Sequence, residues 1–105
     1  MRRVLPWLAA LCAAASTQAA DVQAGKAKAA ACAVCHGALG LSVLPNAPHL
    51  AGQPEIYLVE QLRGYRSGRR SHEVMGVVAK ALTDGDIDDL AAWYGSLKLE
   101  VREPR

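Results

Sequence analysis

The apolar and polar positions of this chain follow the period of helices, and no stretch shows the alternation of a strand. The segment 21–35 is rich in alanine and lysine, which are good helix formers, and Asp21 can cap its start. A second helix is expected with Pro54 in its first turn, because apolar residues then recur at helical spacing until glycines stop the run. The apolar residues are Leu58, Leu62 and Tyr65, and the glycines are Gly64 and Gly68.

Two more helices are expected in the C-terminal half. A short one runs from about His72 to Leu82. The last begins at a capping box formed by Thr83-Asp84-Gly85-Asp86, in which Thr83 is the N-cap. Its apolar side is formed by Ile87, Leu90, Ala91, Tyr94 and Leu97. Glycines and prolines interrupt any regular period from Gly37 to Gln53, and this predicts a long loop of the kind that a cofactor supports.

The N-terminus has a different pattern. Two arginines follow the first methionine, an apolar block covers residues 4–15, and small residues precede the first acid. This order predicts a secretory signal peptide over residues 1–19, with cleavage after Ala19 or, as the alternative, after Ala20. The apolar block is too short to span a bilayer as a retained helix. We therefore expect an exported periplasmic domain over residues 20–105, with no stable membrane insertion.

The charge of the mature domain is balanced. The chain has 12 Lys plus Arg against 10 Asp plus Glu, and the two arginines of the signal account for the difference. Strong nucleic-acid binding, which scales with the number of phosphates neutralised, is not indicated. Two segments each carry an excess of one charge. They can be interpreted as solvated stretches, with the acids at a helix N-terminus, or as a charge dipole that docks a partner. The arginines are Arg63, Arg66, Arg69 and Arg70, and the aspartates are Asp84, Asp86, Asp88 and Asp89.

Two cysteines remain after removal of the signal, which contains Cys12. They lie in Cys32-Ala33-Val34-Cys35-His36, and the Cys-x-x-Cys-His string is the attachment signature of c-type haem. The two thiols add across the two vinyl groups of the porphyrin, and the histidine binds the iron. Three other interpretations compete: a disulfide, a thioredoxin-like pair and half of a zinc site. A zinc site would need a second ligand pair, and a thioredoxin-like pair would need a βαβ context. The string therefore predicts one covalent haem c.

The sixth position on the iron decides whether such a protein carries electrons or binds a small molecule. Met75 is the one methionine left after the signal, and His49 and His72 are the other histidines. A lone methionine is usually a core filler. Met75 nevertheless lies far enough along the chain for the backbone to pass around the haem edge, so we expect it as the ligand, with His72 next. His49 follows Pro48 in a proline-rich stretch, which favours a loop residue.

Short segments between residues 24 and 97, in the right order, match one family. They are Gly25-Lys26-Ala27-Lys28, Cys32 to Gly37, Pro48 to Gln53, Tyr57-Leu58 with Gln61-Leu62, Gly68 with Arg70, Met75, and Leu82-Thr83-Asp84 through Ile87 to Leu90-Ala91-Ala92-Trp93-Tyr94. On these segments the mature chain resembles class I cytochrome c. It is most similar to the small bacterial kind that also occurs as tandem di-haem proteins.

The resemblance implies an all-α fold, the class I cytochrome c fold, with about four helices around one covalently attached haem. It implies that the first and last helices cross near the haem, where Gly25 leaves room for the Trp93 ring.

The resemblance also assigns residues to the haem. It implies that the Pro48 carbonyl accepts a hydrogen bond from His36, which makes the imidazole a stronger donor to iron. Met75 matches the axial methionine of the family. Arg70 matches a basic position that pairs with a haem propionate, although a solvated arginine is an equal alternative. The sequence departs from the family pattern just before Met75, at residues 71–74.

Function follows from this coordination. An iron with two strong protein ligands has no open site, so we expect a single-electron carrier and not an enzyme. Redox protein partners would dock transiently at the exposed haem edge. One alternative is a haem c subunit of a periplasmic dehydrogenase. The other, which requires that Met75 does not bind iron, is a protein that binds a gas or a peroxide.

Overall fold

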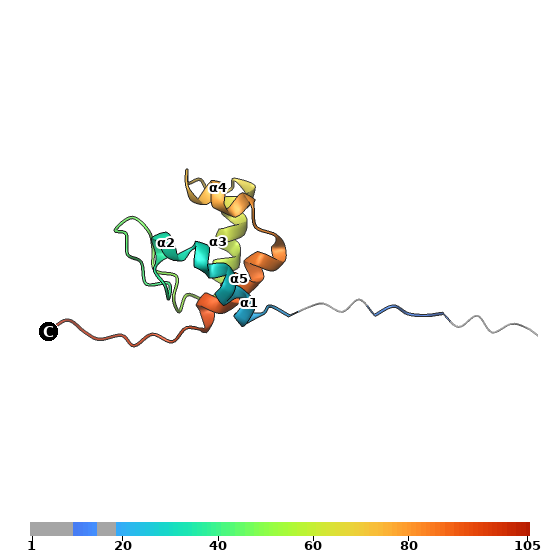
Figure 1. Ribbon diagram of the computed structural model, residues 1–105, viewed down its shortest axis with the longest axis horizontal. Coiled ribbons are helices and arrows are strands. Elements are labelled where there is room, and N and C mark those ends of the chain that lie inside the picture. Colours follow the sequence, from blue (N-terminus) through green and yellow to red (C-terminus); the bar gives the residue numbers. More distant parts are fainter. Residues whose placement is uncertain (1–9, 15–18) are drawn as a thin grey trace, which may run out of the picture.

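The computed structural model describes residues 10–14 and 19–105. These residues form α1 (Val22–Lys28), a 3-10 turn η1 (Ala29–Ala31), α2 (Ala33–His36), α3 (Glu55–Ser67), α4 (Met75–Lys80) and α5 (Asp84–Ser96) (Figure 1). They contain no strand, which confirms the all-α prediction. None of the described helices is long and apolar enough to cross a membrane. Most of the predicted signal peptide lies outside the described residues.

The helix expected over residues 21–35 forms as three short consecutive pieces, α1, η1 and α2. Asp21 caps the first of them as predicted, since its carboxylate accepts hydrogen bonds from Gln23 N at 2.9 Å and Ala24 N at 3.0 Å. The tighter 3-10 turn joins α1 to α2, so the helical path continues to the two cysteines.

Helices α1 and α5 cross at Gly25, and Figure 1 shows them side by side. A Cβ atom on Gly25 would lie 1.9 Å from the Asp89 carbonyl oxygen and 2.9 Å from Trp93 Cβ. Only glycine allows the two backbones to approach this closely. The crossing expected at Gly25 and Trp93 is therefore confirmed. Around it lies the main cluster of buried residues: Ala29, Leu58, Leu90, Ala91, Trp93 and Tyr94.

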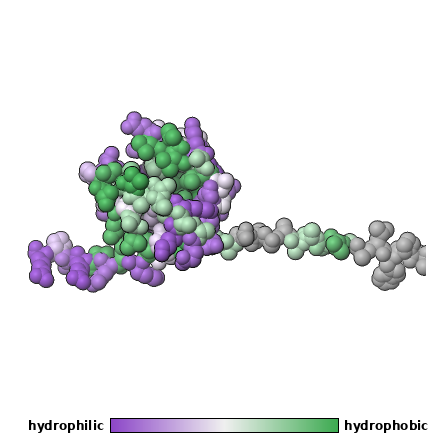
Figure 2. Space-filling view, in the orientation of Figure 1, coloured by the Kyte–Doolittle hydropathy of each residue, from purple (hydrophilic) through white to green (hydrophobic). Residues whose placement is uncertain are grey.

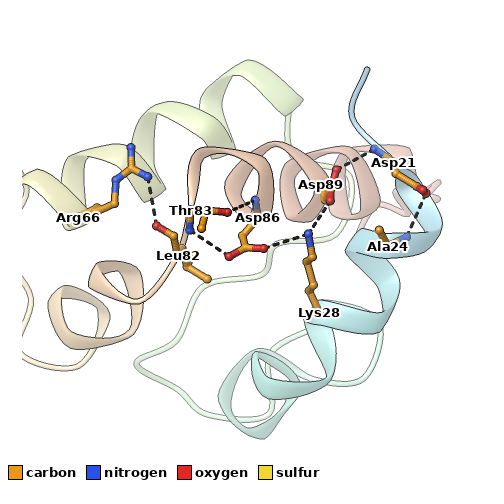
Figure 3. Close-up of polar contacts among 8 residues, drawn as sticks. All are labelled: Asp21, Ala24, Lys28, Arg66, Leu82, Thr83, Asp86 and Asp89. Atoms are coloured by element: carbon orange, nitrogen blue, oxygen red, sulfur yellow. Dashed lines mark hydrogen bonds and ion pairs between the residues drawn. The ribbon is translucent and has the colours of Figure 1, made fainter. Parts of the chain in front are cut away.

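Polar contacts also join α1 to α5 (Figure 3). The predicted capping box is present, because Asp86 N donates to Thr83 Oγ1 and Thr83 N donates to Asp86 Oδ2, each at 3.0 Å. Lys28 Nζ reaches Asp86 at 3.0 Å and Asp89 at 2.6 Å, and Asp21 N donates to Asp89 at 2.8 Å. These contacts raise the pKa of Lys28 and lower the pKa of both aspartates.

The arginine and aspartate segments contact each other, which neither sequence interpretation included, while Asp84 and Asp86 lie in the first turn of α5 as the first interpretation expected. Arg66 pairs with Asp84 and also donates to the Leu82 carbonyl at 3.2 Å, and Arg63 lies 3.7 Å from Asp88. Arg66 lowers the pKa of Asp84. The charges of α3 and α5 therefore face each other within the domain.

Three helix boundaries differ from the expected ones. Pro54 lies just before α3 instead of within its first turn. Gly64 does not stop α3, whose last residue is Ser67, because the backbone turns only at Gly68, where φ is 83°. Helix α4 covers Met75–Lys80 and is shorter than the predicted span of 72–82. Residues 73 and 74 form a turn ahead of it.

Candidate functional site: two cysteines, two ligands and a loop

The proposed attachment residues lie on one helical turn. Cys35 N and His36 N both donate to the Cys32 carbonyl, at 3.3 Å and 2.9 Å. Residues three and four positions apart share one face of a helix, so both thiols and the imidazole project from the same side. Both cysteines are free and half-buried. The Cys-x-x-Cys-His spacing thus places the two thiols and the imidazole on one side of the turn formed by Cys32 and α2.

His36 is buried and has a fixed orientation. Its Nδ1 donates to the Pro48 carbonyl oxygen at 2.8 Å, which is the hydrogen bond that the family resemblance implies. With the proton on Nδ1, the lone pair is on Nε2, the nitrogen that can bind a metal. Gly37 directs the chain away at once, with φ 84°, and a Cβ there would lie 1.8 Å from the Leu41 carbonyl oxygen.

The loop 37–53 is anchored to α5. The Gly40 carbonyl accepts hydrogen bonds from Leu50 N at 2.7 Å and Ala51 N at 3.1 Å, which closes the loop. Gly52 N donates to the Tyr94 carbonyl at 2.9 Å, and a Cβ on Gly40 would lie 2.8 Å from the Tyr94 ring. These contacts bring the Pro48 segment to His36.

His49 is part of the same loop, as predicted. Its Nδ1 accepts a hydrogen bond from Ser42 N at 2.7 Å.

Half-buried Cys32 lies beside buried Tyr94, a neighbour that the sequence did not predict. Tyr94 is 3% exposed, and its hydroxyl has no hydrogen-bond partner among the described residues. Burial raises the pKa of Tyr94, and the neighbouring Cys32 adds to this. Burial also raises the pKa of the Cys32 thiol. Because this setting disfavours a charged thiolate, a neutral thioether suits Cys32 well.

Met75 is half-buried at the first residue of α4. His72, the other ligand candidate, contacts the same turn: its Nδ1 accepts hydrogen bonds from Val74 N and Met75 N, each at 3.2 Å. One ring nitrogen of His72 is therefore occupied by the backbone next to Met75.

Arg70 has partners on α3. Its Nη1 donates to Gln61 Oε1 at 2.5 Å, and its guanidinium lies 4.6 Å from the centre of the Tyr65 ring. The side chain is thus held by a hydrogen bond and a cation–π contact, and the predicted role toward a propionate stays a prediction.

These residues fit a haem group. Apolar side chains are exposed in the loop 37–53 and on α4, and Figure 2 shows apolar residues gathered over these elements. A flat, apolar porphyrin can cover such side chains, which include Leu39, Leu41, Val43 and Leu44 of the loop and Val74, Val77 and Val78 near Met75. Within residues 10–14 and 19–105, no three His, Cys, Asp or Glu side chains gather as a site for a bare metal ion. The second ligand pair of a zinc site is not found there.

Known proteins are similar to this chain in sequence. The family model described as Cytochrome c matches residues 22–98. The chain is 46% identical over 83 residues to cytochrome c4 of Pseudomonas aeruginosa, covering 79% of this chain and 41% of that protein. It is 41% identical over 99 residues to a thiosulfate dehydrogenase electron acceptor of Thiomonas intermedia, covering 93% of this chain and 45% of that protein. This chain thus spans less than half the length of these relatives.

A solved structure shows the same fold. The crystal structure of reduced recombinant cytochrome c4 from Pseudomonas stutzeri superposes with a TM-score of 0.71 at 39% identity. The match covers 76% of this chain and 47% of that one. The predicted class I cytochrome c fold is therefore confirmed, with five α-helices in the described residues where about four were expected. Proteins of this family carry electrons on a covalently bound haem c and its iron. The chain belongs to the cytochrome c family.

Proposed function

We propose that this chain is a periplasmic single-electron carrier with one covalently bound haem c, ligated by His36 and Met75. The observation that carries the proposal is the turn at the end of α2, where Cys32, Cys35 and His36 share one face. The hydrogen bond from His36 to Pro48 aligns the imidazole with that face. No residue is assigned a catalytic role.

On the proximal side, each residue has one task. Cys32 and Cys35 hold the group through thioether bonds. His36 offers Nε2 to the iron, and Pro48 fixes the ring through Nδ1 at 2.8 Å. When bound, the haem supplies a one-electron iron couple. Because the loop 37–53 is anchored on Tyr94, the imidazole is held in one orientation and needs little reorganisation.

Met75 would supply the second protein ligand to the iron. Its thioether sulfur favours ferrous iron and, in an apolar setting, raises the reduction potential. Val74 precedes it and Val77 and Val78 follow it on α4, and these exposed side chains would give a bound haem an apolar surround. A closed coordination sphere restricts the protein to electron exchange, and a weak partner would dock over a small patch at the haem edge. Arg70 is proposed as a secondary contact to a propionate.

We further propose that residues 1–19 are a signal peptide and that residues 20–105 are the mature domain. The basic start, the apolar block and the small residues before Asp21 support this. The cleavage site is testable by the same mass measurement as the attachment.

One experiment tests the attachment. The full chain is expressed with a periplasmic haem-attachment system, and the intact mass of the exported protein is measured. We expect a chain that begins at residue 20 and carries one haem, whereas Cys35→Ala should yield little stable holoprotein. The physical reason is that a small domain has a marginal core, and covalent attachment adds a constraint. Normal amounts of intact Cys35→Ala holoprotein would contradict the proposal.

A second candidate is the role of electron acceptor within a dehydrogenase system. The Thiomonas intermedia relative, described as a thiosulfate dehydrogenase electron acceptor, favours it because the match covers 93% of this chain. The haem chemistry would be the same. Co-purification of a larger catalytic partner at salt concentrations that screen surface charge would support a stable subunit, and recovery of the free domain would support a diffusing carrier.

A further inference from the structure

We propose that His72 is a positioning residue for Met75: its imidazole caps the turn that presents the methionine sulfur to the iron. This inference rests on the proposed function, in which Met75 is the sixth ligand.

The hydrogen bonds around His72 are those of an N-cap. Its carbonyl accepts from Gly76 N at 2.8 Å, the first bond of a helical turn. Its Nδ1 accepts from Val74 N and Met75 N at 3.2 Å each. An N-cap side chain accepts from the N–H groups two and three residues after it, and His72 does this for the turn that leads into α4. The His72 ring therefore occupies the place that serine or aspartate usually fills.

The imidazole is itself located by α3. It meets the Tyr65 ring edge to face, with centroids 6.3 Å apart and planes at 73°. The Tyr65 ring also contacts the Arg70 guanidinium, which lies 4.6 Å from the ring centroid and donates to Gln61 Oε1 at 2.5 Å. A continuous set of contacts thus runs from α3 through His72 to the backbone of Met75.

The cap matters because α4 is short. A helix of six residues is unstable alone, since too few hydrogen bonds offset the cost of nucleation. Among the described helices, α4 packs mainly against α3. Without the imidazole, Val74 N and Met75 N lose their acceptor and the first turn opens more often. Met75 then spends more time away from the iron.

The test measures how readily Met75 is displaced. Imidazole is added to the ferric holoprotein, and its binding is followed by absorbance. We expect about a fivefold faster displacement in His72→Ala, which corresponds to the free energy of one N-cap. His72→Asp should restore the wild-type rate, because a carboxylate accepts the same two hydrogen bonds.

Thr83→Ala is the matched control. It removes the cap of α5, where Thr83 Oγ1 accepts from Asp86 N at 3.0 Å. It should lower the stability of the domain by a similar amount without faster imidazole binding. An unchanged rate in His72→Ala, or an equal acceleration in Thr83→Ala, would overturn the positioning role while leaving Met75 ligation intact. Absence of methionine ligation in the wild-type holoprotein would overturn the proposed function as well, and the two failures are thereby distinguished.

Discussion

Replacing Gly25 by alanine should separate the two helices that form the framework of the domain. The new Cβ would lie 1.9 Å from the Asp89 carbonyl oxygen and 2.6 Å from its carbonyl carbon. Backbone atoms cannot rotate away, so α1 and α5 must move apart. Overpacking of this kind costs about 3 kcal/mol or more, against a gain of about 1 kcal/mol in helix propensity. The net loss is about 2 kcal/mol or more, which lowers the melting temperature by about 10 °C in a domain of this size.

The assay is urea unfolding of the ferric holoprotein, followed by circular dichroism. Gly85→Ala is the matched control, because its new Cβ would meet only Thr83 Oγ1, at 3.8 Å, an ordinary contact. That variant should be as stable as the wild type or more so. If Gly25→Ala unfolds at the wild-type urea concentration, the close crossing of α1 and α5 does not determine the stability of the fold.

Three other predictions concern Tyr94, acid stability and Lys28. Tyr94→Phe should change the free energy of unfolding by less than about 1 kcal/mol, because the hydroxyl is buried without a hydrogen-bond partner among the described residues. Tyr94→Ala should cost about 3 kcal/mol or more through lost packing. A large loss in Tyr94→Phe would show that the hydroxyl has a partner in the holoprotein. The Asp21 N–H and Lys28 lower the pKa of Asp89, so its carboxylate stabilises the fold above the unfolded pKa of about 3.9 and ceases to do so as the pH falls through the lower folded value. Urea midpoints below pH of about 4 should therefore fall less steeply in Asp89→Asn than in the wild type, and parallel curves would refute this. Asp89 and Asp86 raise the pKa of Lys28, so its contribution is complete below the unfolded pKa of about 10.4 and is lost as the pH rises through the higher folded value. Lys28→Met should remove this alkaline loss, and an unchanged alkaline slope would count against the ion pairs.

Much of the fold could be predicted because its signals are local. Asp21 and the Thr83 box are caps, and cap chemistry depends on residues within one turn. Helix ends were harder. Gly64 lies inside α3, where it is buried, because the tertiary contacts of the helix outweigh the weak preference of one glycine. The contact between the arginine and aspartate segments depends on how α3 and α5 pack, which no local pattern encodes.

The candidate site likewise has parts that the local sequence predicts and parts that depend on tertiary packing. The Cys-x-x-Cys-His string is a local motif, and its geometry on one turn follows from helical spacing. The hydrogen bond between His36 and Pro48 was expected only through the family resemblance, because it spans a long irregular loop. The Tyr94 hydroxyl beside Cys32 and the cap formed by His72 were not expected at all. Both depend on side-chain orientation, and histidine has no strong preference as an N-cap.

The most direct test of the account is a proton NMR spectrum of the reduced wild-type holoprotein and of Met75→Ala. A methionine methyl bound to diamagnetic haem iron is shifted strongly upfield. The account predicts this signal in the wild type and its loss in Met75→Ala, together with no binding of carbon monoxide by the reduced wild type. Absence of the signal in the wild type, accompanied by carbon monoxide binding, would contradict a closed electron carrier and indicate an iron that binds small molecules.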